Sequence, residues 1–207
     1  MTLNAALADG LARLTLVLPD DAQSKLIEYI NLIGKWNRVY NLTAARKPEK
    51  VLTHHILDSL AVAPHISART LLDVGSGAGL PGIPLALALP QAQVILLDSN
   101  QKKCAFLNQA VIELTLDNVK VVCARIEEWQ TDQRFDLVIS RAFSELAKFV
   151  APTARLCAPG GTLLAMKGVE PLAEIEQLPG QFHLSHVTPL KVPGLDAQRH
   201  LVFMRAA

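Results

Sequence analysis

Glycine residues crowd one short stretch of this chain in a spacing that favours the binding of a ligand to the backbone. The stretch reads Asp73-Val-Gly75-Ser-Gly77-Ala-Gly79-Leu-Pro-Gly82 and follows a run of apolar residues typical of a strand. Glycines in such a turn permit positive φ angles and let a ligand approach without meeting a Cβ atom. The helix that follows would offer free amide donors to an anionic group, here a carboxylate.

An acidic residue stands at the end of the next apolar run. Asp98 closes the segment Val94 to Leu97, about twenty residues after the glycines, where a carboxylate can accept both hydroxyls of a ribose. Gly75, Gly77 and Asp98 are therefore predicted to bind a nucleoside. The pattern does not specify which nucleoside, because the same turn also satisfies the G-x-G-x-x-G pattern of dinucleotide-binding loops.

Four later residues, each following an apolar run, are expected near the same ligand. Val119 to Cys123 leads into Ile126 and Glu127, which are candidates for packing on an adenine ring and accepting its exocyclic amine. Acids are also favoured at a helix N-terminus, so Glu127 has a structural alternative. Arg141 and Lys167 each follow another apolar run and are interpreted either as ligand contacts or as members of structural salt bridges.

The elements that position these residues follow from the alternation of short apolar runs with segments of helical period, which predicts a parallel sheet with right-handed crossovers. Before Ala68, residues 20–43 and 49–63 have the period of two amphipathic helices. We expect residues 1–68 to form an N-terminal helical extension and residues 69–207 to form the sheet domain, together one compact unit. The strand-like runs are Thr70 to Val74, Val94 to Leu97, Val119 to Cys123, Phe135 to Ser140 and Thr162 to Met166.

The C-terminal segments break this alternation. Phe182 to Val192 and His200 to Arg205 are both strand-like, and the seven-residue linker between them is too short for a crossover helix, so they should pair antiparallel. A mostly parallel seven-stranded sheet ending in an antiparallel hairpin is the Rossmann-like fold of class I methyltransferases. Because Asp73 could also hold an amino group, the sequence predicts S-adenosyl-L-methionine as cofactor. An NAD-dependent oxidoreductase and a noncatalytic nucleotide-regulated RNA-binding module are the alternatives.

Missing motifs narrow the chemistry. No Asn-Pro-Pro-Tyr type of motif, which holds a planar amine, follows the fourth run, and no Pro-Cys pair offers a nucleophile for pyrimidines. Cys104, Cys123 and Cys157 are odd in number, widely spaced and in apolar surroundings, which argues against a disulfide and against a metal site. His54 and His55 are adjacent on a predicted helix and point about 100° apart, so no metal is expected.

The composition favours a cytoplasmic protein. Half of the 207 residues are apolar, which suffices for a full core, and the formal net charge of +1 lacks the basic excess of many nucleic-acid binders. The sequence shows neither a signal peptide nor an apolar stretch of membrane-spanning length. We expect no membrane attachment, and a monomer is favoured.

Several motifs, in order along nearly the whole chain, resemble the RsmG family, also called GidB. The resemblance implies methylation of N7 of guanine 527 in 16S ribosomal RNA, either naked or in a small-subunit particle. Guanine N7 has a free lone pair and no proton to lose, which agrees with the lack of an acid/base constellation, and no catalytic residue is assigned. Its implied cofactor contacts are Gly75, Leu80, Ile126, Glu127 and Arg141. The motifs are Lys35-Trp36-Asn37-x-x-Tyr40-Asn41-Leu42-Thr43, His55-Ile-Leu-Asp58-Ser59, Asp73 to Pro84, Ile139-Ser-Arg141-Ala-Phe143 and Arg199-His200-Leu201.

Contacts to RNA are expected from basic residues in two places. Lys167, Arg199 and His200 are the candidates at the sheet edge, although His200 also suits structural hydrogen bonding. Arg141 is assigned to positioning, because a cation beside the acceptor would oppose the positive charge that moves from sulfur to the base. Trp36 and Tyr40 are interpreted as core residues rather than stacking platforms. A phosphate-binding patch, or alternatively a solvated helix face, is formed by Lys35, Arg38, Arg46, Lys47 and Lys50.

Overall fold

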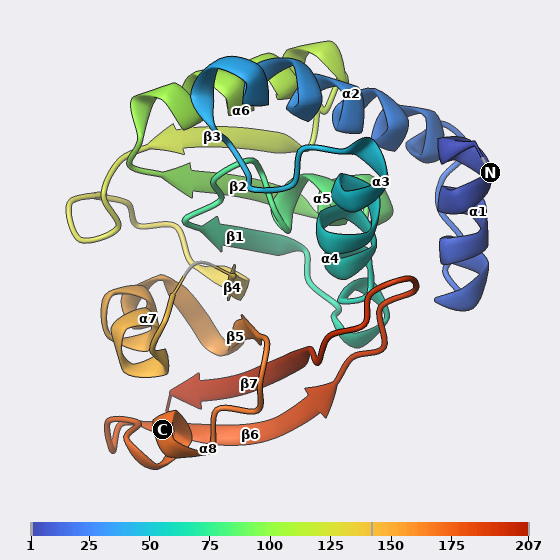
Figure 1. Ribbon diagram of the computed structural model, residues 1–207. Helices are drawn as coiled ribbons and strands as arrows, with labels where there is room; N and C mark the ends of the chain where they lie inside the picture. Colours follow the sequence, from blue (N-terminus) through green and yellow to red (C-terminus); the bar gives the residue numbers. More distant parts are fainter. Residues whose placement is uncertain (1, 142, 207) are drawn as a thin grey trace.

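A seven-stranded sheet forms the centre of the computed structural model, which describes residues 2–141 and 143–206 (Figure 1). The strand order is β3-β2-β1-β4-β5-β7-β6, and β7 runs antiparallel to both of its neighbours while the other pairs are parallel. The predicted sheet with its terminal antiparallel hairpin is therefore confirmed. The strands are β1 (Thr70–Val74), β2 (Gln93–Asp98), β3 (Val119–Cys123), β4 (Phe135–Ser140), β5 (Cys157–Lys167), β6 (Phe182–Pro189) and β7 (His200–Ala206).

The N-terminal segment is helical as predicted, but the helix predicted over residues 49–63 changes its hydrogen-bond pattern along its length. The long helix α2 (Ala22–Tyr40) ends where Asn41 takes a left-handed conformation. The next helix changes its hydrogen bonding from α to π and back, and such π segments are frequent at functional sites. In order, these elements are α1 (Leu3–Arg13), α2, α3 (Pro48–Val51), the π-helical segment η1 (Leu52–Leu57), α4 (Asp58–Leu60) and the 3-10 turn η2 (Ala63–His65).

Both faces of the sheet are covered, which explains why its strands read as continuous apolar runs. Leu71 and Leu72 are adjacent in β1 but belong to different buried clusters, because side chains alternate between the faces of a strand. One cluster includes Leu26 of α2 and the other includes Phe149 of α7. The covering helices after β1 are α5 (Gly82–Ala88), α6 (Gln101–Glu113), α7 (Leu146–Thr153), the 3-10 turn η3 (Ala154–Leu156) and α8 (Leu172–Glu176).

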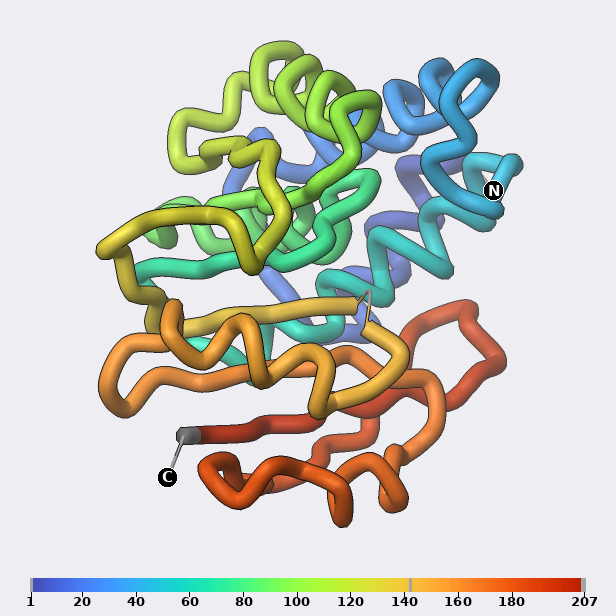
Figure 2. Tube along the Cα trace, turned by 90° about the vertical axis from the view of Figure 1, so that its left-hand side faces the viewer, coloured from blue at the N-terminus to red at the C-terminus, as the bar shows by residue number. Residues whose placement is uncertain are grey.

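The arrangement of the elements gathers the predicted site residues at one edge. The arrowheads of β1, β2 and β3 point the same way in Figure 1, so the loops that follow these strands leave the sheet on one side. Figure 2 shows α6 and the red C-terminal hairpin at opposite ends of the sheet. Ala142, inside the Ile139 to Phe143 motif, lies outside the described residues.

Two cysteines that are far apart in the sequence meet in the fold. Cys104 and Cys123 form a disulfide with a Cα to Cα distance of 5.8 Å, within the usual range for such bonds. The expectation that the cysteines argue against a disulfide is therefore wrong for this pair. The reason is the sheet register, because Cys123 lies beside Asp98 in the neighbouring strand and α6 begins shortly after Asp98. Cys157 is buried and free.

Candidate functional site

The turn after β1 has the backbone conformation that its glycines permit. Gly75 and Gly77 have φ angles of 72° and 60°, in the left-handed region where other residues are strained. A Cβ atom at Gly77 would lie 3.8 Å from the Gly75 carbonyl oxygen and 4.0 Å from Lys103 Nζ, so it would clash with no other atom of the protein. The space beside Gly77 is thus open to a ligand.

The buried carboxyl group of Asp73 holds this turn through a hydrogen bond. Asp73 Oδ2 accepts a hydrogen bond from the Gly82 amide at 2.9 Å, and the Tyr29 hydroxyl of α2 donates to the Ala78 carbonyl. Burial raises the pKa of Asp73 to about 7, although the Gly82 hydrogen bond opposes this. Among the buried side-chain oxygens and nitrogens of the described residues, Asp73 Oδ1 is the one without a hydrogen-bond partner. A cationic amino group would satisfy this oxygen.

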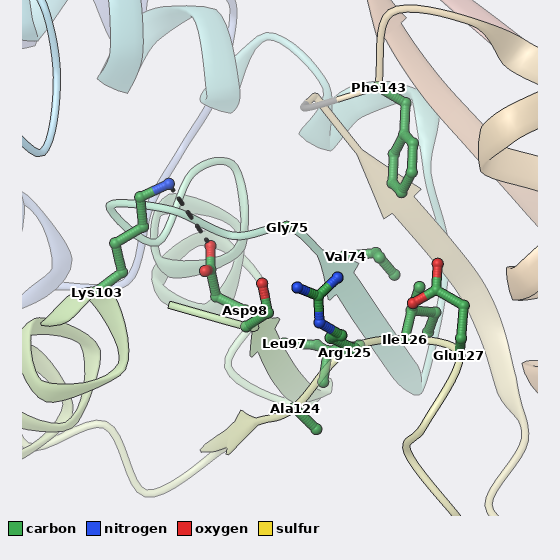
Figure 3. Close-up of a pocket in the computed structure, with 11 residues that line it drawn as sticks. Val74, Gly75, Leu97, Asp98, Lys103, Ala124, Arg125, Ile126, Glu127 and Phe143 are labelled. Carbon is green, nitrogen blue, oxygen red and sulfur yellow. Dashed lines mark ion pairs between the residues drawn. The ribbon is translucent and has the colours of Figure 1, made fainter. Parts of the chain in front are cut away.

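Asp98 connects the glycine turn to the helix that follows β2. Its Oδ2 atom accepts a hydrogen bond from the Gly77 amide and its Oδ1 atom accepts one from the Asn100 amide, both at 2.8 Å. Lys103 Nζ lies 4.0 Å from Oδ2, as the dashed line in Figure 3 marks. Each carboxylate oxygen has a second lone pair, so the two hydroxyls of a ribose could still bind here.

Three cavities lie along this edge of the sheet. The first, which we call the β3-side cavity, has a volume of about 320 Å³. Figure 3 shows Ile126 and Glu127 on one side of this space and Phe143 on the other, with Asp98 at its edge. Ile126 is buried, which suits packing on a ring, whereas Glu127 is exposed and accessible to a polar group. The predicted adenosine contacts thus lie together around one cavity.

Two further cavities continue the row along the sheet edge. The glycine-turn cavity, about 180 Å³, shares Gly75 with the β3-side cavity and is also lined by Gly77 and Leu80. The arginine cavity, about 410 Å³, shares Arg141 with the glycine-turn cavity. The three spaces therefore adjoin one another in the order β3-side, glycine-turn, arginine. The arginine cavity is lined by His54, His55, Asp58, Arg141, Met166, Lys167, Gly168 and Arg199.

Asp58 lies between two arginines in the arginine cavity. Its Oδ2 atom is 3.3 Å from Arg141 Nη1, and its Oδ1 atom accepts a hydrogen bond from Arg199 Nε at 2.8 Å. The Asp58 residue is only 1% exposed. The salt-bridge alternative for Arg141 is thus realised, yet the same side chain lines two of the cavities.

His55 is the neutral member of this cluster. Burial, together with the nearby Arg141 guanidinium, lowers the pKa of His55 to about 4, so the imidazole is uncharged at neutral pH. The hydrogen-bond network assigns the proton to Nδ1, which donates to the His54 carbonyl at 2.8 Å, while Nε2 accepts from the Thr43 hydroxyl. His54 and His55 both line the arginine cavity.

Asn37 holds the segment after α2 in place. Its amide donates to the carbonyls of Thr43 at 3.0 Å and Ala45 at 3.1 Å, and its Oδ1 atom accepts from the Thr43 amide. Thr43 in turn lines the glycine-turn cavity. The motif residues between Trp36 and Asp58 therefore shape the cavities, a role that sequence reasoning had not given to Asn37, Thr43 or Asp58.

Two candidate substrate contacts already have protein partners. Lys167 Nζ lies 2.7 Å from Glu174 Oε2 and donates to the Ser144 carbonyl at 2.7 Å, so it ties β5 to α8 although it lines the arginine cavity. His200 Nδ1 lies 3.1 Å from the Gly168 carbonyl oxygen, as its structural alternative requires. Arg199, which directly precedes β7, also lines the arginine cavity, and its Nε donates to Asp58.

The aromatic and basic residues of the N-terminal segment differ in exposure. Trp36 is partly buried and packs against Phe106 with ring centroids 5.6 Å apart, whereas Tyr40, interpreted as core, is 43% exposed. Arg46 donates to the Asn37 carbonyl and to Asn41 Oδ1, which fixes its guanidinium against the chain. Lys35, Arg38, Lys47 and Lys50 are exposed.

Within the described ranges, no group of three histidine, cysteine or acidic residues is arranged to hold a metal ion. None of the described helices is long and apolar enough to cross a membrane.

Comparison with known proteins gives a consistent result. The family model described as GidB, rRNA small subunit methyltransferase G, matches residues 22–202. The ribosomal RNA small subunit methyltransferase G of Nitrosospira multiformis is 53% identical, over 97% of this chain and 96% of its own. The proteins of the same name from Laribacter hongkongensis and Neisseria meningitidis serogroup A are 52% and 54% identical, covering 98% and 94% of both chains.

Solved structures of low sequence identity share the fold. The glycopeptide N-methyltransferase MtfA, in complex with S-adenosyl-L-homocysteine, superposes with a TM-score of 0.60 at 15% identity, covering 74% of this chain and 87% of its own. A SAM-dependent methyltransferase from Aquifex aeolicus gives a TM-score of 0.57 at 18% identity, with coverages of 75% and 92%. These likenesses place the chain in the methyltransferase fold class predicted from its sheet.

Proposed function

The chain belongs to the rRNA small subunit methyltransferase G (GidB) family, and on this premise we propose that it methylates N7 of guanine 527 in 16S ribosomal RNA. The observation that carries the proposal is the row of three adjoining cavities, joined at Gly75 and Arg141. Such a row can hold a nucleoside at one end and an acceptor base at the other. Family membership favours this function over an NAD-dependent oxidoreductase or a noncatalytic RNA-binding module.

The first two cavities fit S-adenosyl-L-methionine. When bound, this cofactor supplies an electrophilic methyl group on a sulfonium sulfur. The unsatisfied Asp73 Oδ1 beneath the turn suits its amino group, and Asp98 keeps lone pairs for the two ribose hydroxyls. The proposed cofactor contacts are Gly75, Gly77, Leu80, Asp98, Ile126, Glu127 and Arg141, all of which line these two cavities.

The arginine cavity is the proposed acceptor site. Guanine N7 carries a free lone pair, so the reaction needs no residue to remove a proton, and the neutral His55 need not act as a base. The chain then contributes mainly by holding the acceptor in line, an effect that can supply roughly 7 to 11 kcal/mol in favourable cases. Arg199 is proposed to contact the nucleotide. Lys167 is proposed to line the nucleotide site while its ion pair with Glu174 fixes the cavity wall.

The remaining surface supports an RNA partner. The exposed Lys35, Arg38, Lys47 and Lys50 are proposed to meet phosphates of 16S rRNA, whether naked or in a small-subunit particle. We also propose a cytoplasmic monomer. One buried cluster contains Leu26, Ile56 and Leu96, which supports the view that residues 1–68 and 69–207 fold as one unit.

Labelled cofactor tests this proposal. Purified protein with methyl-labelled S-adenosylmethionine should transfer label to 16S rRNA or to small-subunit particles. Thermal shifts should show that S-adenosylmethionine, and not NAD, raises the melting temperature, because only a ligand of the native state stabilises it. Cofactor binding without label transfer to either substrate would reject the proposed reaction.

A further inference from the structure

Asp58 is the only carboxylate among the described residues that line the arginine cavity. We propose that it is a positioning residue for methyl transfer. It restrains Arg199, which holds the acceptor nucleotide, and Arg141, the proposed cofactor contact that lines both adjoining cavities, so that neither guanidinium covers N7 of the guanine. This inference rests on the proposed function. It gives a role to a residue of the N-terminal extension that is proposed to touch neither the base nor the cofactor.

The position of Asp58 links parts of the chain that are otherwise separate. Arg141 follows β4 and Arg199 precedes β7, and β5 lies between these strands in the sheet. Asp58 begins α4, immediately after the π-helical segment η1. Its two oxygens contact one arginine each, at 3.3 and 2.8 Å, so one carboxylate fixes the relative position of two guanidinium groups.

The restraint uses particular donors of each arginine. Arg199 donates Nε to Asp58 and Nη1 to the Gln198 carbonyl, both at 2.8 Å. Arg141 approaches Asp58 through Nη1, which also lies 3.4 Å from His55 Nδ1. Paired donors of an arginine are what grip the N7 and O6 atoms of guanine in the commonest specific contact to that base. The protein thus engages Nε and Nη1 of Arg199 and Nη1 of Arg141, which leaves each arginine fewer donors for that grip.

An arginine bound to N7 would block the reaction, because its N–H group would occupy the lone pair that must accept the methyl group. By restraining the two arginines, Asp58 therefore allows the nucleotide to bind without an arginine blocking guanine N7. The remaining N–H groups of the two arginines stay available for phosphate or for O6.

Charge in the cavity favours the same role. Lys167 is paired with Glu174, and His55 is neutral, so Arg141 and Arg199 are the two cations that Asp58 offsets. The base gains positive charge as the methyl group arrives. Loss of the carboxylate would leave a second uncompensated cation beside a base that is becoming cationic, and the transition state would suffer more than the bound ground state.

The test compares Asp58→Asn with wild type in steady-state methylation of 16S rRNA or small-subunit particles. We expect kcat to fall at least tenfold, with KM for the RNA unchanged or lower, because unrestrained arginines still bind guanine. The dissociation constant for S-adenosylmethionine alone, measured by calorimetry, should change less than threefold. Asp9→Asn, an exposed carboxylate of α1, is the matched control and should leave all three quantities unchanged.

A double-mutant cycle separates positioning from general damage. If Asp58 acts through Arg199, then Asp58→Asn should cost at least threefold less in the Arg199→Gln background than in wild type. Equal costs in both backgrounds, or a kcat within twofold of wild type for Asp58→Asn, would overturn the inference. Should Asp58→Asn fail to fold, Arg199→Lys replaces it, since lysine keeps the charge but lacks the Nε donor.

For Arg199→Lys the expected result is again a tenfold loss of kcat with RNA affinity retained, and an unchanged kcat would overturn the inference. Failure of the proposed function is a different outcome, because the wild-type protein itself would then methylate no guanine. A wild type that methylates N7 together with a fully active Asp58→Asn variant rejects only the role of Asp58.

Discussion

The Gly77 amide donates a hydrogen bond to Asp98 Oδ2 at 2.8 Å, which joins the turn after β1 to the end of β2. Both residues line the row of cavities, so the backbone that admits the cofactor and the carboxylate that would hold its ribose are fixed to each other. The same contact explains why a glycine turn and an acid about twenty residues later act as one unit.

Replacing the carboxylate should weaken cofactor binding. Asp98→Asn removes the charge from hydrogen bonds that are each worth about 1.5 to 3 kcal/mol, so the dissociation constant for S-adenosylmethionine should rise roughly 10- to 100-fold. Isothermal titration calorimetry measures this directly. Asp117→Asn, at an exposed acid that lines none of the three cavities of the proposed site, is the control. An Asp98→Asn affinity equal to that of wild type would remove Asp98 from the site.

Gly77 and Gly160 form a matched pair for testing the glycine turn. Both have positive φ angles, 60° and 76°, and neither would bring a Cβ atom into a clash. Alanine at either position should therefore cost about 1 to 2 kcal/mol of stability. Only Gly77→Ala should abolish cofactor binding, because its methyl group would project beside the glycine-turn cavity. Equal cofactor affinities for the two variants, measured by calorimetry, would contradict the assignment.

The buried Asp73 predicts how pH acts on stability. Its folded-state pKa of about 7 lies above the ordinary 3.8, so its contribution to stability is fully present below about pH 4 and is lost as pH rises through 7. Asp73→Asn should therefore flatten the fall in the free energy of unfolding over this range. The comparison with wild type is needed because His55, with its pKa lowered to about 4, contributes in the opposite direction.

The pH dependence of cofactor binding is a second test of the Asp73 carboxyl group. A cationic amino group prefers the ionised Asp73, so the wild-type affinity for S-adenosylmethionine should increase as pH rises through about 7. Calorimetry at several pH values measures the slope, and Asp73→Asn should remove it. A slope that survives in the variant would show that another group titrates.

Tyr29 predicts an effect of the N-terminal extension on the cofactor site. Tyr29→Phe deletes the hydroxyl that donates to the buried Ala78 carbonyl, which should cost about 1 to 3 kcal/mol in the free energy of unfolding. Because this carbonyl belongs to the glycine turn, affinity for S-adenosylmethionine should fall as well. Chemical denaturation and calorimetry measure the two effects, and Tyr40→Phe, at a partly exposed position, is the control.

The Cys104 to Cys123 disulfide is checked by counting thiols. Protein purified without reductant and then denatured should show one reactive thiol, that of Cys157, and three after reduction. Three thiols before reduction would show that the pair is reduced in solution. Cys157→Ser should lower each count by one.

The sheet could be predicted because each strand is marked by the residue types of a short stretch of the sequence. The runs that became β1, β3 and β4 have the predicted bounds. The central strands β1 and β4 are almost entirely buried and therefore mostly apolar, whereas β3 at the edge was recognised by its valines. The glycine turn and Asp98 were recognisable for the same reason, because each depends on residue type and a short spacing along the chain.

The remaining features depend on distant partners. Asp58 contacts residues 83 and 141 positions away, and nothing near it in the sequence indicates that two arginines would meet there. Lys167 was a reasonable candidate for RNA at a strand end, but its partner Glu174 lies on a helix that the pattern did not specify. Cys104 and Cys123 became neighbours only through the pairing of β2 with β3.

Mapping the methylated atom in the RNA is the most direct test of the proposed reaction. 16S rRNA or small-subunit particles lacking the modification would be incubated with this protein and S-adenosylmethionine, and the RNA would then be mapped by N7-selective chain cleavage. We expect one new cleavage, at guanine 527, which depends on both the protein and the cofactor. Methylation at another atom or another nucleotide, or an unmodified guanine 527 despite cofactor binding, would contradict it.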